Sequence, residues 1–318
     1  MCTSIRFADK SGNLYLARNL DWNTRYGEQV VYTPEGYELG LSFADNAPAR
    51  YNVLGMAVAA GNYPLYFDCG NDAGLAVAGL NHPGNTVYTP EPVEGKMNIA
   101  AYEFPLWIAA RFATVEEARA ALADVNIVAK PFAPGQFVSK LHWIIGDATG
   151  SIVVEQLEDG LHVFDNPVDT LSNQPEFPWH LTNLRNFITV SNEFGLPAKW
   201  RDADLAPFGA GAGSRGLPGD SYSTSRFVRA AFHNANYPEK ETEAQSVSRA
   251  FHILSSVAMI EGASKMGNGE FERTLYTGCF SAASNSYYYS TYDQPALVCI
   301  SMDDMRARMT DNQHIVIE

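Results

Sequence analysis

The sequence lacks the features that mark several classes of protein. No apolar run approaches the roughly 18 residues of a membrane-spanning helix, and Arg6, Asp9 and Lys10 stand where a secretory signal would need an apolar segment. No stripe of Lys and Arg offsets the formal net charge of −14, which repels the phosphates of nucleic acids. We therefore expect a cytoplasmic protein that binds neither nucleic acid nor membranes.

Cysteine and metal-binding patterns are also scarce. The four cysteines are Cys2, Cys69, Cys279 and Cys299, and no two of them have the spacing of a CxxC motif, so neither a zinc site nor a redox pair is predicted. Cys69, Cys279 and Cys299 are expected to be buried apolar side chains. None of the seven histidines has a ligand spacing such as HExxH, and we expect no metal and no cofactor.

Apolar residues make up 46% of the 318 residues, enough for a sizeable core. No repeat or linker divides the chain, so we expect one domain over residues 1–318. The opening predicts a β-hairpin, because Cys2–Phe7 alternates, Asp9–Asn13 has turn residues and Leu14–Arg18 runs back. Further strands are expected at Tyr51–Ala60, Gly74–Leu80, Leu141–Ile145, Ser151–Gln156, Thr274–Ser281, Ser286–Tyr292 and Ala296–Ser301.

Helices are predicted between the groups of strands. Pro105 is expected either to kink the first of them or to mark its true start. The glycine-rich segment Gly209–Gly219 is expected to be a loop beside a ligand. Clustered strands with paired helices favour two layers of antiparallel sheet with helices outside, an α+β fold, over a parallel βαβ repeat. The expected helices are Asn98–Phe112, Val115–Val125, Phe177–Asn192 and Thr242–Ile260.

The most informative position is Cys2, directly after Met1. A small side chain at position 2 normally allows Met1 to be removed, so we expect the mature chain to begin with a cysteine that carries a thiol and a free α-amine. An unperturbed α-amine has a pKa of about 7.7–8.0 and is partly unprotonated near neutral pH, so it can accept the thiol proton. One residue would then supply both nucleophile and base. The alternative is an ordinary small residue at a frayed terminus.

Two charged residues close the first hairpin, across the strand pairing from Cys2. The fixed positive charge of Arg18 can stabilise a thiolate, and Asp21 can orient the terminal ammonium. The alternative for Arg18 and Asp21 is an ordinary ion pair on the surface.

Three further polar residues are candidates for the same site. Asn81 ends a strand of small residues, where its amide can donate to an oxyanion, although a turn residue is the simpler interpretation. Asn173 precedes a predicted helix and is open to the alternative of a helix cap. Arg226 follows the glycine-rich loop and is either a second positive charge near the thiol, a carboxylate clamp or a surface charge.

Several segments together carry a resemblance to a known family: MCTSIRF, ARNLDW, VLGMAVA, NDAGLAVAGLN, EFPLW, LHWIIGD, SIVVEQ, TLSNQPEF, GLPGDSYSTSRFVRAAF and SYYYSTYD. In order and spacing the chain resembles the choloylglycine hydrolase family, the bile salt hydrolases and penicillin V acylases among the N-terminal nucleophile hydrolases. The resemblance covers residues 1 to about 293 and is strongest to bile salt hydrolases of intestinal anaerobes.

The resemblance implies a four-layer αββα sandwich and a homotetramer. Many similar penicillin V acylases carry Tyr where Asn81 stands, which favours bile salts as substrates of this chain. Ser4 stands where many relatives have Gly, a conservative departure. The resemblance also implies six catalytic residues: Cys2 as nucleophile, Arg18 and Asp21 as its immediate partners, Asn81 and Asn173 at the oxyanion site, and Arg226 completing the polar cluster.

We accordingly expect hydrolysis of the amide bond of glycine- or taurine-conjugated bile acids through a thioester on Cys2. A steroid needs an apolar pocket with few polar groups. The candidate pocket residues flank the polar cluster or lie in or beside the loop at 130–136, and each is open to the alternative of a core position: Leu20, Trp22, Phe132 and Phe137.

Three other functions remain open. A penicillin V acylase would share the mechanism and differ in the shape of its pocket. An N-acyltransferase would let an amino acid, in place of water, capture the acyl-thioester. A non-catalytic bile-salt-binding protein would result if Met1 were retained and blocked Cys2.

Overall fold

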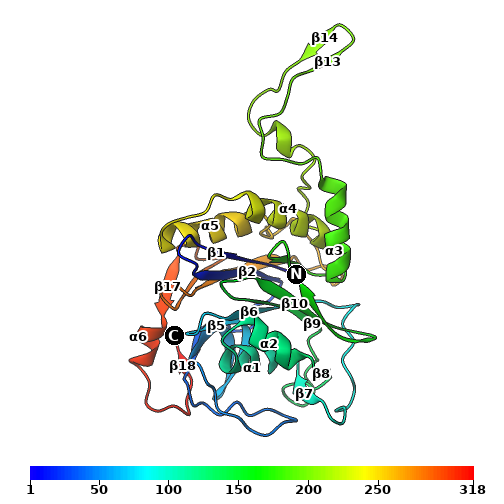
Figure 1. The fold of residues 1–318 in the computed structure, drawn as a ribbon. Helices are drawn as coiled ribbons and strands as arrows, with labels where there is room; N and C mark the ends of the chain where they lie inside the picture. Colours follow the sequence, from blue (N-terminus) through cyan, green and yellow to red (C-terminus); the bar gives the residue numbers. More distant parts are fainter.

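Two large antiparallel sheets pack face to face, with helices on both outer sides, in the computed structural model, which describes residues 1–318 (Figure 1). The first sheet has six strands in the order β12 (Thr170–Leu171), β1 (Cys2–Ala8), β2 (Leu14–Trp22), β15 (Arg273–Ser281), β16 (Ser286–Thr291) and β17 (Val298–Ser301).

The second sheet has eight strands. Several of them read as nearly continuous apolar runs because they are covered on one face by the first sheet and on the other by helices. Their order is β11 (Gly160–Asp165), β10 (Ser151–Leu157), β9 (Leu141–Gly146), β6 (Ala76–Asn81), β5 (Tyr63–Asn71), β4 (Val53–Ala60), β3 (Gln29–Thr33) and β18 (Val316–Ile317).

Helices close the sandwich on both sides. α4 (Ser223–Asn236) and α5 (Glu243–Ser255) cover the six-stranded sheet, and α1 (Phe104–Arg111) and α2 (Val115–Leu122) lie outside the eight-stranded sheet (Figure 1). No helix has both the length and the apolar character that a membrane span requires. The remaining elements are the parallel pair β7 (Met97–Ala100) and β8 (Val125–Val128), α3 (Phe177–Asn183) and α6 (Met302–Arg306).

Three clusters of buried side chains fill the spaces between the four layers. Phe104 and Ile145 belong to the cluster between α1 and the eight-stranded sheet, Leu54 and Tyr276 to the one between the sheets, and Ile253 to the one beneath α5. Each fully buried large apolar side chain stabilises the fold by about 1.5–3 kcal/mol relative to exposure. The α+β prediction and the αββα sandwich are therefore confirmed.

The first predicted helix is wrong over its first turns. Its opening residues form β7, and α1 begins only at Phe104, with Pro105 in the first turn, where a missing N–H costs nothing. Thr114 and Thr242 cap α2 and α5, since Thr114 accepts from the backbone N–H of Glu117 and Thr242 from that of Gln245. α2, α3 and α5 each end before the C-terminal limit predicted for them.

Two further differences concern α4 and Cys299. α4 is not among the predicted helices and begins shortly after the glycine-rich segment Gly209–Gly219. Cys69 and Cys279 are buried as predicted, whereas Cys299 is exposed, because β17 is the edge strand of its sheet.

An arm between α3 and α4 stands away from the four layers (Figure 1). At its far end, β13 (Ala198–Trp200) and β14 (Ala203–Leu205) form a small antiparallel hairpin. Large apolar side chains are exposed along the arm, namely Ile188, Phe194, Leu196, Trp200 and Phe208.

Candidate active site

Cys2 is held in the interior of a sheet. It begins β1, which pairs with β12 on one side and with β2 on the other, and Cys2 itself lies opposite Leu20. The side chain is almost fully buried, with 6% of its surface exposed. The hairpin predicted from the sequence thus fixes the thiol in place, which a nucleophile needs for repeated attack from one direction.

Arg18 lies directly beside the thiol. On β2, its Nη2 is 2.8 Å from Cys2 Sγ, and the side chain is fully buried. Its ion-pair partner is Asp68, at 3.6 Å, so the surface Arg18–Asp21 pair considered as an alternative is wrong. Burial lowers the pKa of Arg18, but the charges of neighbouring groups, among them Tyr276 and Cys2, raise it by more than burial lowers it. The net pKa is above that of a free guanidinium, so Arg18 stays charged.

The backbone nitrogen of Cys2 has its own partner. It donates to Asn173 Oδ1 at 2.8 Å, and Arg226 Nη2 donates to the same oxygen at 2.7 Å. Arg226 Nη1 also donates to the carbonyl of Cys2 at 2.6 Å. Arg226 is therefore a fully buried residue, and the alternative of a surface charge is wrong. It fixes both Asn173 and the chain at Cys2.

Both ends of the Asn173 amide group have hydrogen-bond partners. Its Nδ2 donates to the carbonyl of Asn81 at 2.6 Å, while its oxygen faces Cys2 and Arg226. Asn173 caps no helix, since Glu176 occupies the cap position of α3. In this geometry Asn173 orients the nitrogen of Cys2, and the role of oxyanion donor expected for it stays a prediction.

Asn81 ends β6 and lines the cavity in front of Cys2. Its side-chain amide makes no hydrogen bond within the chain, whereas its backbone carbonyl accepts from Asn173. The Asn81 side chain is therefore free to donate to a group that enters the cavity.

Asp21 is the last of the predicted catalytic residues and lies next to the N-terminus of the chain. Its Oδ1 accepts from Thr274 Oγ1 at 2.6 Å, and its Oδ2 is buried without a hydrogen bond, 3.9 Å from Arg226 Nη1. The amine of Met1 donates to the carbonyl of Asp21 at 2.6 Å and contacts Glu272. Burial lowers the pKa of this terminal amine, which favours its unprotonated form. The structure thus brings the six predicted catalytic residues together.

A cavity of about 420 Å³ opens in front of Cys2. This volume lies in the range of small-molecule sites, and most of the lining is apolar. All four predicted pocket residues, Leu20, Trp22, Phe132 and Phe137, line the cavity, although their contact with substrate stays a prediction. No residue of the segment at 209–219 lines it.

Sequence reasoning missed many lining residues because they lie on strands and loops without a motif. Tyr26, which follows ARNLDW by a few positions, had the clearest available signal. The other missed residues include Val58, Leu65, Tyr66, Phe67, Tyr102, Val138 and Leu141, whereas Lys130, Pro131 and Gln136 belong to the loop at 130–136 that the sequence predicts beside the pocket.

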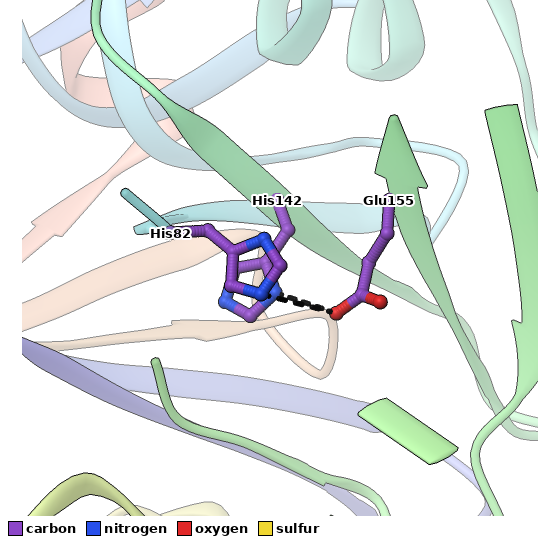
Figure 2. A group of neighbouring side chains, drawn as sticks. All are labelled: His82, His142 and Glu155. Carbon is purple, nitrogen blue, oxygen red and sulfur yellow. Dashed lines mark hydrogen bonds and ion pairs between the residues drawn. The ribbon is translucent and has the colours of Figure 1, made fainter. Parts of the chain in front are cut away.

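His82, His142 and Glu155 form a buried group of neighbouring side chains (Figure 2). The two imidazole rings stack with centroids 4.1 Å apart and planes within 5°. Because ring-nitrogen lone pairs lie in the ring planes, parallel stacked rings cannot both point at one ion at the 2.0–2.1 Å typical of zinc. His142 also uses both nitrogens, with Glu155 Oε1 at 2.9 Å and the Ser172 carbonyl at 2.7 Å. This group does not fit a metal.

His142 of this group and the nearby His180 together position the segment before α3. His142 donates to the carbonyl of Ser172, and His180 Nε2 lies 2.9 Å from the carbonyl of Asn173. Burial lowers the pKa of His82 and of His142 to about 3 and that of His180 to about 4, so all three rings are neutral near pH 7.

A buried thiol at the start of a strand, beside a guanidinium and in the lining of a mainly apolar cavity, suits nucleophilic attack on an acyl group. The αββα sandwich and this site define an amide hydrolase of the N-terminal nucleophile class. The model of the linear amide C–N hydrolases, choloylglycine hydrolase family, matches residues 2–317. The chain belongs to this family, as the sequence predicted.

Relatives and solved structures agree with the family. The chain is 50% identical to a bile salt hydrolase/transferase of Bifidobacterium longum subsp. longum and 43% identical to a conjugated bile acid hydrolase of Lactobacillus acidophilus, each over 96% of both chains. A crystal structure of a conjugated bile acid hydrolase from Clostridium perfringens superposes with a TM-score of 0.91 at 34% identity, covering 100% of this chain and 96% of that one. Penicillin V acylase from Agrobacterium tumefaciens shares the fold, with a TM-score of 0.78 at 20% identity over 99% and 90%.

Proposed function

We propose that this chain hydrolyses the amide bond of glycine- and taurine-conjugated bile acids. The observation that carries the proposal is the position of Cys2 Sγ, 2.8 Å from the Arg18 guanidinium, in a residue that lines a mainly apolar cavity. Relatives at 50% and 43% identity over nearly the whole chain are named as enzymes acting on bile salts. The proposed enzyme is one domain over residues 1–318.

The proposal requires the removal of Met1. In the structure the nitrogen of Cys2 is a peptide N–H, held by Asn173 Oδ1. Cleavage after Met1 would turn that nitrogen into a primary amine at the same place, next to its own thiol. Since the terminus is buried, desolvation disfavours the ammonium form and leaves a neutral amine able to accept a proton.

The reaction follows from these positions. The amine takes the proton of the Cys2 thiol, and the sulfur attacks the amide carbonyl, whose electrons move to oxygen. The free amide of Asn81 is placed to donate to that oxyanion. Collapse breaks the C–N bond, with the amine's proton passing to the leaving glycine or taurine, and leaves a thioester. Water, deprotonated by the same amine, then releases the bile acid and restores the thiol.

The lining of the cavity favours a steroid. A rigid apolar ring system buries its surface against side chains such as Leu20, Trp22 and Phe132 and needs few polar partners. Penicillin V is the alternative substrate, but similarity at 20% identity shows the shared fold alone. Transfer of the acyl group to an amino acid is a second activity of the same thioester, and the Bifidobacterium relative is named a hydrolase/transferase.

We also propose that the enzyme forms a homotetramer through the arm. Its exposed apolar side chains, among them Leu196 at 92% and Trp200 at 75% exposure, are what an association surface presents. Because the nucleophile must remain a free thiol, we further propose the cytoplasm, a reducing compartment, as its location.

The experiment compares product release from glycocholate, taurocholate and penicillin V on one preparation, with Cys2→Ala as the control for background hydrolysis. We expect both bile salts to be cleaved with a higher kcat/KM than penicillin V and the control to be inactive. A higher kcat/KM for penicillin V would overturn the substrate assignment while leaving the mechanism in place.

A further inference from the structure

A second buried acid, which the mechanism above does not use, lies behind Arg18. Asp68 is on β5, and only 3% of its surface is exposed. Its carboxylate is 3.6 Å from Arg18 Nη1, whereas Cys2 Sγ lies 2.8 Å from Nη2 of the same guanidinium. Arg18 therefore contacts both the nucleophile and a fixed carboxylate.

Two tyrosines hold this carboxylate. The hydroxyl of Tyr276 donates to Asp68 Oδ1 at 2.5 Å, and that of Tyr287 donates to Asp68 Oδ2 at 2.5 Å. Both rings are fully buried. A carboxylate that accepts a hydrogen bond on each oxygen is stabilised in its ionised form.

The network joins the two sheets. Asp68 comes from the eight-stranded sheet, whereas Arg18, Tyr276 and Tyr287 come from β2, β15 and β16 of the six-stranded sheet. Gly278 of β15 lies against the side chain of Tyr287, and a Cβ there would collide with the hydroxyl of Tyr287. The absence of a side chain at position 278 thus leaves the space through which Tyr287 reaches Asp68.

The electrostatic consequence follows from the distances. A buried guanidinium without a counter-ion is costly, and a carboxylate within 4 Å offsets much of that cost. The same carboxylate opposes the effect of Arg18 on the thiol, because a negative charge behind the guanidinium reduces the potential at Cys2. Burial raises the pKa of Asp68, and Arg18 and the two tyrosine hydroxyls act against that rise.

We propose that Asp68, held by Tyr276 and Tyr287, is a positioning residue that anchors Arg18 and shares its charge, and so sets how strongly the thiolate of Cys2 is stabilised. This inference rests on the proposed role of Cys2 as nucleophile. An attacking sulfur must be ionised yet remain nucleophilic, and nucleophilicity falls as a thiolate becomes more stable. By reducing the effect of the Arg18 charge, Asp68 keeps the thiolate of Cys2 from becoming so stable that it loses its nucleophilicity.

Several other charged or titratable groups surround the thiol, and none of them is mutated in the test of Asp68. They come from β2, the segment after it, α4, and the chain terminus, and they are Asp21, Tyr26, Arg226 and the terminal amine.

The test is Asp68→Asn, which keeps the shape and removes the charge. Two quantities are measured: the rate of Cys2 alkylation by iodoacetamide as a function of pH, followed by peptide mass because the exposed Cys299 also reacts, and kcat and KM for glycocholate. We expect the pH midpoint of alkylation to fall by on the order of one pH unit. We expect kcat to fall about tenfold or more, with KM changed less than about twofold.

The matched control is Asp147→Asn, another buried carboxylate, which accepts from the backbone of Val115 and lies outside the cavity lining. In Asp147→Asn, neither the pH midpoint of Cys2 alkylation nor kcat for glycocholate should change. An unchanged or raised midpoint in Asp68→Asn, or an equal shift in the control, overturns the proposal. A loss of activity with an unchanged midpoint also overturns it, because a merely structural role would give that result.

Tyr287→Phe keeps the test decisive if Asp68→Asn does not fold. Losing one donor raises the pKa of Asp68 and leaves Arg18 less neutralised, so the alkylation midpoint should fall by a smaller amount. An unchanged midpoint contradicts the proposal. If alkylation of wild-type Cys2 left hydrolysis intact, the nucleophile assignment itself would fail, which separates that failure from a failure of the role of Asp68.

Discussion

The side-chain oxygen of Asn173 lies 2.8 Å from the backbone nitrogen of Cys2, although 171 positions separate them in the sequence. Removal of Met1 would leave this oxygen as the acceptor that orients the new amine beside its thiol. Arg226 fixes the same oxygen from the other side at 2.7 Å. The base of the proposed reaction is thus positioned by a side chain that lies outside the nucleophile's own hairpin.

Asn173→Ala should therefore lower kcat much more than it raises KM. The amine loses its acceptor and rotates away from the thiol, so we expect a loss on the order of 10²-fold, comparable to the loss of a group that acts in the transition state. Asn173→Asp retains an oxygen acceptor beside Arg226 and should keep more activity than Ala. Steady-state kinetics with glycocholate check this, and an alanine variant with near-native kcat would contradict it.

Cys2→Ser should lose most activity while keeping the fold. A hydroxyl ionises far less readily than a thiol, whose unperturbed pKa is about 8.5, so little nucleophile forms near neutral pH. Turnover and thermal unfolding are measured on the same samples. Serine at position 2 with near-native turnover would rule out the sulfur as nucleophile.

Asn81→Ala should reduce kcat by on the order of 10²–10³, because its unpaired amide lines the same cavity as Cys2 and is placed to donate to the oxyanion. The proof that Asn81 acts in the transition state is an unchanged KM. A matched rise in KM with constant kcat would show that Asn81 only binds the ground state.

Asn81→Tyr tests the class of substrate. A large ring at this position of the cavity should crowd a steroid more than penicillin V, so we expect bile salt turnover to fall more than penicillin V turnover. Both substrates are assayed on one preparation. An equal fall for both would show that position 81 does not determine specificity.

The buried histidines should make the protein sensitive to acid. His82, His142 and His180 are neutral in the fold, with pKa values of about 3, 3 and 4, but they titrate near 6.5 when unfolded. The unfolded chain binds more protons below pH 6.5, so their contribution is fully present above 6.5 and is lost as the pH falls towards the folded values. The expected loss is about 1.4 kcal/mol per histidine for each pH unit.

Glu155 acts in the opposite direction. Burial raises its pKa, so above about pH 4.5 the folded state holds a proton that the unfolded state releases, and this contribution weakens as the pH rises. Urea unfolding at pH 7.5 and 5.5 measures the balance. His180→Gln should reduce the difference between the two pH values, whereas His314→Gln, at an exposed site, should not. Equal stability at both pH values in the wild type would contradict the neutral cluster.

The arm should control assembly. Trp200→Glu places a charge in its exposed apolar surface and should convert the proposed tetramer to smaller species. The control Leu297→Glu alters an exposed apolar side chain outside the arm and should leave the mass unchanged. Light scattering coupled to size exclusion measures both, and a tetramer in Trp200→Glu would exclude this residue from the interface.

Much of the site follows from local sequence, because a hairpin places Cys2 and Arg18 together by pairing alone. Arg226 shows where local reasoning ends. By itself it resembles a surface charge, yet it is buried because its partners, Thr3, Asn173 and the carbonyl of Cys2, come from distant parts of the sequence. The resemblance to a family supplied this residue where its local sequence could not.

Asp68 gave no signal in the sequence. It stands in the apolar strand YPLYFDCGN, and its partners Tyr276 and Tyr287 lie more than 200 positions away. Contacts of that separation depend on how the two sheets pack. The boundary between β7 and α1 was hidden for a different reason. The apolar pattern of this segment suits both a helix and a strand.

The central claim is that the amine of Cys2, freed by removal of Met1, activates its own thiol. Intact mass and specific activity, measured together on preparations that differ in the extent of Met1 removal, test it most directly. The account predicts that activity is proportional to the fraction of chains without Met1 and vanishes where Met1 is fully retained. Full activity in a preparation whose mass shows every chain still carrying Met1 would contradict it.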